Sequence, residues 1–132
     1  MKPITAHRYA ILVNKMLVGL RNEFKRDPSV VLKEAIDMAR PQVKLLRVKR
    51  GAKVNIFPVS VSEKESVRLA IKWIIDASAK RNEHNFHERL QSEIRAIVKE
   101  AETAVVQRRN ELHKLALANR SNVKLFDMKR RF

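Results

Sequence analysis

The sequence predicts a mainly α-helical, single-domain protein of about five or six helices with a protruding β-hairpin. Only two glycines and four prolines occur among 132 residues, so few positions interrupt a helix. Apolar residues recur at three- and four-residue steps over most of the chain but alternate in one stretch. A chain of this length supports one hydrophobic core. We therefore expect one domain over residues 1–132, with the hairpin at about 43–61 and a basic tail at about 120–132.

Two helices are expected before Pro41. Thr5 can cap a first helix that runs to about Leu20. Asp27 is a second N-cap, followed by Pro28 at the first helical position, and this helix ends at Pro41. The stripe of the first helix that we expect to face the core is Tyr9, Leu12, Val13, Met16 and Leu20.

The hairpin is predicted from alternation of apolar and polar residues, with its tip near Gly51. The alternation slips by one at Phe57 and Pro58, which predicts a bulge or an edge position where the missing proline N–H does no harm. The apolar residues that we expect to offer a burial face are Leu46, Val48, Val54 and Ile56.

Three further helices follow the hairpin. Ser62 and Glu65 form a capping box, and the helix that they begin ends around Lys80. The fourth helix is expected over about 86–101 and the last over about 107–119. Residues expected to pack in the core away from the hairpin include Val67, Ile71, Ile74, Leu90, Ile94 and Leu115.

The charge balance points to a polyanionic partner. Lys and Arg total 29 against 14 Asp and Glu, which gives a formal charge of +15 and a pI near 10.8. No carboxylate lies between Asp37 and Glu63, so the predicted hairpin carries charge of one sign. Such clusters neutralise phosphates and release counterions. Because aromatic residues are few, the target is expected to be folded RNA rather than a single strand.

Candidate RNA contacts come from the basic hairpin and the residues just before it, the basic last helix, the first helix and the third helix. Trp73 is among them, although packing in the core is the alternative interpretation of a lone indole. His113 is interpreted as an RNA contact or a packing contact. The full set is Lys2, Arg8, Asn14, Lys15, Arg40, Lys44, Arg47, Lys49, Arg50, Lys53, Lys72, Trp73, Arg108, Arg109, His113, Lys114, Asn119 and Arg120.

The sequence argues against catalysis, and we expect no metal and no cofactor. The chain has no cysteine, which removes disulfides, thiolate metal sites and cysteine nucleophiles. It has no glycine-rich phosphate loop and no nucleophile elbow. His84, His87 and Glu88 resemble a metal-ligand pair but lack a third ligand, so they are interpreted as solvent-facing. The apolar runs are far shorter than the ~20 residues of a membrane span, so a soluble protein without membrane contacts is expected.

Several motifs, in a preserved order that covers nearly the whole chain, resemble one known family, the universal small-subunit ribosomal protein seven family. They are Asn14-Lys15 with Gly19, Asp27-Pro28 with 35–41, Gly51-Ala52 leading to Pro58-Val59, Leu69-Ala70-Ile71-Lys72-Trp73, Glu88-Arg89-Leu90, Arg108-Arg109, Leu112-His113-Lys114 and Ala118-Asn119-Arg120.

The resemblance implies a non-enzymatic constituent of the small ribosomal subunit. It implies binding to the 3′ major (head) domain of small-subunit rRNA, a part in head assembly, and a position near the exit-site tRNA and the mRNA exit path. Protein eleven of the small subunit is an implied neighbour. The form of the motifs in 112–122 favours a mitochondrial member acting in the matrix mitoribosome, with another organelle or the bacterial cytoplasm as alternatives.

The sequence departs from the family pattern in three places. The basic N-terminal arm is reduced to Lys2, His7 and Arg8, and the chain ends Arg130-Arg131-Phe132 where the family ends in an aromatic Tyr-Arg-Trp. A family helix is missing, and the resemblance places the gap between Leu20 and Arg21. We therefore expect a break in the chain path at that point.

Two other function classes compete with RNA binding. A basic helical DNA-binding or architectural protein is the main alternative, since helices and a basic hairpin can also grip duplex DNA. A cationic helix at a membrane surface is the third, but the cations cluster on the hairpin and tail rather than opposite one apolar helical face.

Overall fold

The computed structural model describes residues 3–100 and 103–120. These residues form five helices and one two-stranded antiparallel sheet, which confirms the mainly α-helical fold with a hairpin. The elements are α1 (Pro3–Phe24), α2 (Pro28–Ala39), β1 (Val43–Arg50), β2 (Lys53–Ser60), α3 (Glu63–Ser78), α4 (Phe86–Glu100) and α5 (Ala104–Ala118).

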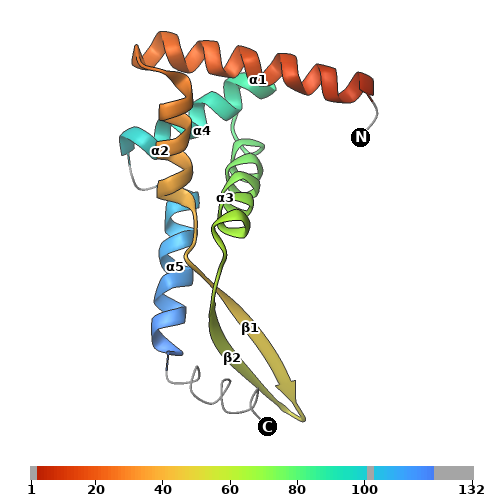
Figure 1. Cartoon of the computed structure of the whole chain (residues 1–132), viewed down its shortest axis with the longest axis vertical. Helices are drawn as coiled ribbons and strands as arrows, with labels where there is room; N and C mark the ends of the chain where they lie inside the picture. Colours follow the sequence, from red (N-terminus) through yellow and green to blue (C-terminus); the bar gives the residue numbers. More distant parts are fainter. Residues whose placement is uncertain (1–2, 101–102, 121–132) are drawn as a thin grey trace.

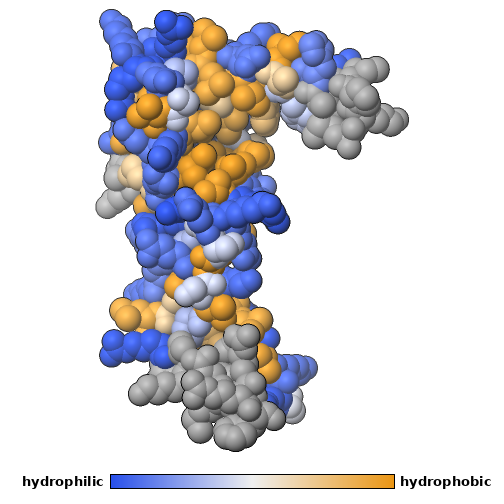
Figure 2. Space-filling model, in the orientation of Figure 1, coloured by the Kyte–Doolittle hydropathy of each residue, from blue (hydrophilic) through white to orange (hydrophobic). Residues whose placement is uncertain are grey.

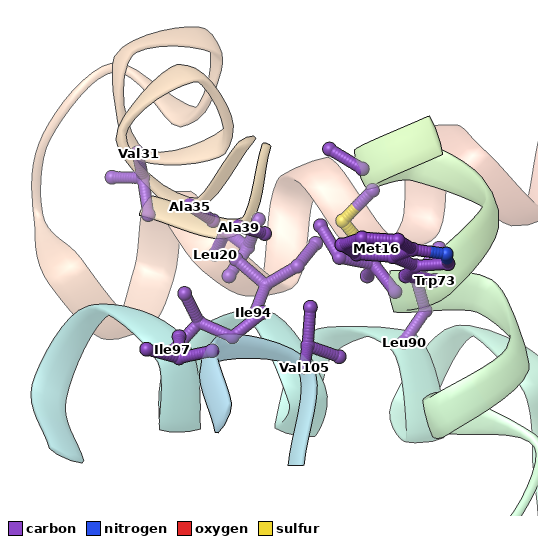
Figure 3. Close-up of a cluster of buried hydrophobic side chains, with 13 residues drawn as sticks. Met16, Leu20, Val31, Ala35, Ala39, Trp73, Leu90, Ile94, Ile97 and Val105 are labelled. Carbon is purple, nitrogen blue, oxygen red and sulfur yellow. The ribbon is translucent and has the colours of Figure 1, made fainter. Parts of the chain in front are cut away.

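The helices form an elongated body with the hairpin at one end (Figure 1). Helices α1 and α4 lie across the opposite end, while α2, α3 and α5 run along the long axis. Aliphatic side chains from these helices meet beside Trp73 in one core (Figure 3). Its buried members are Met16, Leu20, Val31, Ala35, Ala39, Ala70, Trp73, Ile74, Leu90, Ile94, Ile97, Val105 and Val106.

The expected caps of α2 and α3 are present. The Asp27 carboxylate accepts a hydrogen bond from the Ser29 backbone N–H at 3.0 Å, and Pro28 occupies the first turn. The Ser62 hydroxyl accepts from the Glu65 backbone N–H at 3.2 Å. Each cap satisfies an amide that would otherwise have no intrahelical partner.

Helix α5 begins three residues earlier than the sequence indicated. Thr103 is its N-cap, and the Thr103 hydroxyl accepts from the Val106 backbone N–H at 3.4 Å. Val105 and Val106 are both buried, so tertiary packing outweighs the weak helix propensity of these β-branched residues.

Helix α1 runs without interruption through Leu20 and Arg21, so the expected break at that point is wrong. Leu20 is buried in the core, and the chain turns only at Lys25, which has a positive φ of 54°. The stripe of α1 is buried in its second half alone, because the first half extends past the body (Figure 1). Tyr9 and Val13 are accordingly 47% and 38% exposed.

The hairpin has a continuous register without a bulge, so the second of the two expected alternatives, an edge position for Pro58, is the one observed. Strand pairs run from Val43 opposite Ser60 to Arg50 opposite Lys53. Gly51 has a φ of 58°, which suits the first position of a two-residue type II′ turn. Counted from such a turn, Pro58 falls in a non-hydrogen-bonded pair, where its missing N–H disrupts no ladder bond.

The same register overturns the expectation of one apolar face on the hairpin. Residues that lie directly opposite share a face. Leu46 faces the same way as Phe57, whereas Ile56 lies opposite Arg47 on the other face. Of the four expected residues, Leu46 and Val48 therefore project from one face and Val54 and Ile56 from the other. Phe57 is the fully buried hairpin side chain among the described residues.

Two residues expected in the core are exposed. Ile71 is 41% exposed and Leu115 is 49% exposed, while Ile74, Leu90 and Ile94 are buried as expected. The periodicity of α3 is correct, but the neighbouring helices cover only part of its apolar face.

Candidate nucleic-acid interface

The root of the hairpin is held by hydrogen bonds to every backbone polar group of the short connection 40–42. The Arg40 N–H donates to the Ile36 carbonyl at 2.8 Å, and the Gln42 carbonyl accepts from the Val61 N–H at 3.2 Å. The Ser66 hydroxyl of α3 donates to the Pro41 carbonyl at 2.5 Å. Since unpaired buried backbone groups are costly, these bonds fix the direction in which the hairpin leaves the body.

Helix α5 supplies the remaining two bonds to the root. The Arg109 Nε donates to the Arg40 carbonyl at 2.9 Å. The His113 Nε2 accepts from the Gln42 backbone N–H at 3.0 Å, so the imidazole is neutral there. Burial, and then the charge of Arg109, lower the pKa of His113. His113 is thus a structural contact in the described fold.

Cations near the root are paired with carboxylates of α2 and of the first turn of α3. The Lys44 ammonium lies 3.1 Å from the Glu65 carboxylate. Arg40 lies 3.7 Å from Glu63 and 3.8 Å from Asp37. These partly exposed pairs orient the root but leave little net positive charge for an RNA phosphate.

The tip of the hairpin is different, because its cations have no acidic partner among the residues that the structure describes. Arg47, Lys49, Arg50 and Lys53 are exposed, and within the described part of the chain none of the four forms an ion pair. The register distributes them over both faces. The tip can therefore meet phosphates on either side.

Helix α5 and the turn that follows it add a second group of cations. Arg108, Lys114 and Arg120 are exposed, and the Arg108 guanidinium lies 4.6 Å from the Trp73 ring centroid. Trp73 itself is only 7% exposed. The Trp73 ring lies in the core beneath Arg108, which favours the packing interpretation of Trp73 over an RNA contact.

The remaining predicted contacts do not join this surface. Arg8, Asn14 and Lys15 are exposed on α1, at the end of the molecule opposite the hairpin (Figure 1). Lys72 is exposed on α3, and Lys2 lies outside the described residues.

Asn119 ends α5 rather than pointing freely to solvent. Its side-chain amide donates to the Leu115 carbonyl at 2.8 Å, which satisfies a carbonyl at the helix end. Most of the predicted set thus divides into a hairpin tip, its root with α5, and a separate group on α1. Lys72 on α3, Trp73 in the core and Lys2 belong to none of these groups.

Two anchoring residues were not predicted as part of the site. Ser66 is buried within α3, and Gln42 contributes only its backbone. The signal that could have found Ser66 is a small polar residue on the inward-facing side of an otherwise apolar helix stripe.

The described residues contain no group of three or more His, Asp or Glu side chains able to hold a metal ion. His84 is exposed and His87 is partly buried on α4. Among the helices described, none is long and apolar enough to cross a bilayer.

The chain is similar to ribosomal proteins over most of its length. Residues 7–120 match the family described as ribosomal protein S7p/S5e. The small ribosomal subunit protein uS7 of Paracoccus denitrificans is 38% identical over 110 residues, covering 83% of this chain and 70% of the relative. That of Beutenbergia cavernae is 34% identical over 120 residues, covering 91% and 74%. The chain therefore belongs to the ribosomal protein S7p/S5e family, a family of non-enzymatic structural proteins of the small ribosomal subunit.

Proposed function

We propose that this protein binds small-subunit rRNA through the hairpin tip together with the exposed cations of α5. The observation that carries the proposal is the contrast along the hairpin. The root is rigidly bonded and its cations are paired, while the four tip cations are exposed and have no acidic partner among the described residues. A rigid arm that presents unpaired cations can enter folded RNA at little cost in conformational entropy.

The position that we propose for the protein within the small subunit follows from the family resemblance. The target is the 3′ major (head) domain of the rRNA, whose folding the protein helps to organise. The arm lies near the exit-site tRNA and the mRNA exit path, and protein eleven is a neighbour. Cations at both ends of an elongated body support contacts with separate rRNA segments, as expected of an assembly scaffold (Figure 1).

The proposed compartment is the mitochondrial matrix, within the mitoribosome. The matched relatives are bacterial, so a bacterial-type ribosome is consistent with both an organellar and a bacterial setting. Fractionation of cells that express the tagged protein would decide this: recovery with mitochondrial small subunits supports the proposal, and recovery with cytoplasmic ribosomes contradicts it.

Direct binding assays test the RNA assignment. We would titrate the full chain against an rRNA head-domain fragment and a duplex DNA of equal length at matched salt. The proposal expects markedly tighter binding to the rRNA fragment at each salt concentration. Equal affinity for both would favour the alternative of a DNA-binding or architectural protein, since non-specific phosphate contacts do not discriminate between the two.

A further inference from the structure

An apolar groove opens to solvent between α2 and α3, beneath α1. Its volume is about 180 Å³, and every side chain that lines it is aliphatic or Met, including Leu32 and Ile36 of α2 and Ile71 of α3. Figure 2 shows this apolar surface in the upper half of the molecule, bounded by hydrophilic residues on the side nearer the hairpin. The groove lies away from the proposed RNA-binding arm.

The apolar side chains that form the walls of the groove are partly exposed to solvent. Val13 on α1 is 38% exposed, and Ile71 and Ile75 on α3 are 41% and 42% exposed. Met16 and Ile94 in the floor are buried members of the core. A contiguous apolar surface continuous with the core, on a chain this strongly charged, is typical of a binding site.

A row of cations lines the α3 side of the groove. Lys64, Arg68 and Lys72 follow one another at four-residue spacing, so they lie along one line of the helix. Arg68 precedes Ile71 by three residues, and Lys72 precedes Ile75 by three, which places this line beside the groove wall. All three are exposed, and in the described chain they have no ion-pair partner.

The α2 side carries the same sign. Lys33 lies three residues before Ile36 and is exposed, and it has no ion-pair partner within the described residues. The nearby carboxylate of Asp37 is engaged with Arg40 at 3.8 Å. The groove is therefore an apolar trough between two cationic rims.

We propose that this groove binds an amphipathic helix of a neighbouring small-subunit protein, with an apolar ridge flanked by Asp and Glu. The trough lies between two helices and offers no hydrogen-bonding group, so it suits aliphatic side chains at three- and four-residue spacing. The cationic rims then pair with the flanking carboxylates. This occupant goes beyond the proposed rRNA binding and does not depend on it.

Other occupants fit less well. An RNA strand could pair its phosphates with the cationic rims, but it would not cover the apolar floor with apolar groups. A second copy of this chain carries a formal charge of +15 and would bring like charges together. The chain's own segment 121–132 holds Lys124, Lys129, Arg130 and Arg131 against one acid, Asp127, so it has the wrong sign for the rims.

A peptide titration tests both the floor and the rims. The probes are two designed helical peptides with the same Leu ridge, one flanked by Glu and the other by Lys. Their binding to the full chain is measured by fluorescence anisotropy in the absence of RNA. We expect the Glu peptide to bind at least roughly tenfold more tightly than the Lys peptide. Ile71→Glu should abolish this binding. Ile11→Glu is the matched control, because Ile11 is 42% exposed on α1 and does not line the groove.

Equal affinity for the two peptides, or binding that survives Ile71→Glu, would overturn the proposal. In assembled small subunits, a photo-crosslinking residue at Ile75 gives a second measurement. A crosslinked peptide with an apolar helical stripe and acidic flanks supports the proposal, and a product with rRNA, a second copy or residues 121–132 refutes it. Circular dichroism of each variant confirms that the helical fold is retained.

Discussion

Charges in the helical body and charges at the hairpin tip are arranged in opposite ways. In the body, the Glu93 carboxylate is only 5% exposed and lies 2.7 Å from Arg81, and Glu23 lies between Arg95 and Lys99. At the tip, the cations are exposed and unpaired in the described chain. The paired body charges therefore serve folding, whereas the tip cations have no acidic partner among the described residues, so substitutions of the two groups should affect different measurements.

Removing the cation of the buried pair should give the largest loss of stability. Arg81→Ala leaves the Glu93 carboxylate buried without a partner, which costs about 3 kcal/mol. The control is Arg26→Ala, because Arg26 pairs with Glu34 in an exposed position at 2.9 Å, where solvent screening leaves an ion pair little effect on stability. Urea unfolding of both variants measures the difference. Similar losses would show that burial of Glu93 does not govern the outcome.

The hairpin root should be sensitive to pH through His113. Its folded pKa is lowered from an ordinary value of 6.5, by burial and by Arg109, and its neutral Nε2 accepts from Gln42. The unfolded chain therefore binds the proton more readily than the folded chain. The contribution of neutral His113 to the free energy of unfolding is fully present above the unfolded pKa. It decreases as the pH falls through about 6.5.

Unfolding measured from about pH 7.5 to about pH 5.5 checks this effect. We expect a loss on the order of 1 kcal/mol, comparable to one hydrogen bond. His113→Gln cannot titrate and should flatten the profile over this range. If the variant and the original chain show the same pH dependence, another group is responsible.

Much of the fold could be predicted from the sequence because local signals agreed with tertiary packing. Asp27-Pro28 and Ser62 mark helix starts through their own backbone chemistry, and Gly51 marks the hairpin turn. The faces of the hairpin could not be predicted, because alternation within each strand does not state which residues lie opposite one another. The continuity of α1 was missed because a gap in a motif comparison does not locate the missing segment in space.

Only part of the candidate site could be predicted from the sequence. The sequence alone shows that the hairpin region has no carboxylate, and this signal predicted the exposed cations Arg47 and Lys49. Burial of Trp73 beneath Arg108, and the bonds from Arg109 and His113 to the hairpin root, depend on how α5 packs against α3 and β1. These contacts join residues far apart in sequence, which periodicity cannot reveal.

Neutralising the tip should change RNA binding with almost no effect on stability. Lys49→Gln combined with Arg50→Gln removes two cations that form no ion pair among the described residues, so the slope of log affinity against log salt should flatten by about two units. The free energy of unfolding should change by less than about 0.5 kcal/mol. Lys44→Gln is a useful comparison, because Lys44 is paired with Glu65 and should alter the slope less. An unchanged slope in the double variant would mean that the tip does not contact phosphates.

Shortening the hairpin should have the smallest effect on the helical body, provided that the strand register is kept. Val48 lies opposite Asn55, so replacing 49–54 by Asn-Gly closes the shorter hairpin on an existing pair. Replacing only 49–53 would instead bring Val48 opposite Val54. That one-residue slip moves the side chains of one strand to the other face, so this deletion is the matched control.

We expect the register-keeping deletion to retain helical circular dichroism and the full chain's unfolding midpoint, because the core residues come from the helices. The slipped deletion should disturb Phe57, which is buried near the middle of β2, and lower the midpoint. Subunits that carry the register-keeping deletion should still assemble but handle exit-site tRNA or the mRNA exit path poorly, if the proposed placement holds. Unfolding of the isolated protein by the register-keeping deletion would show that the hairpin tip is part of the core, and the projecting-arm mechanism would then be wrong.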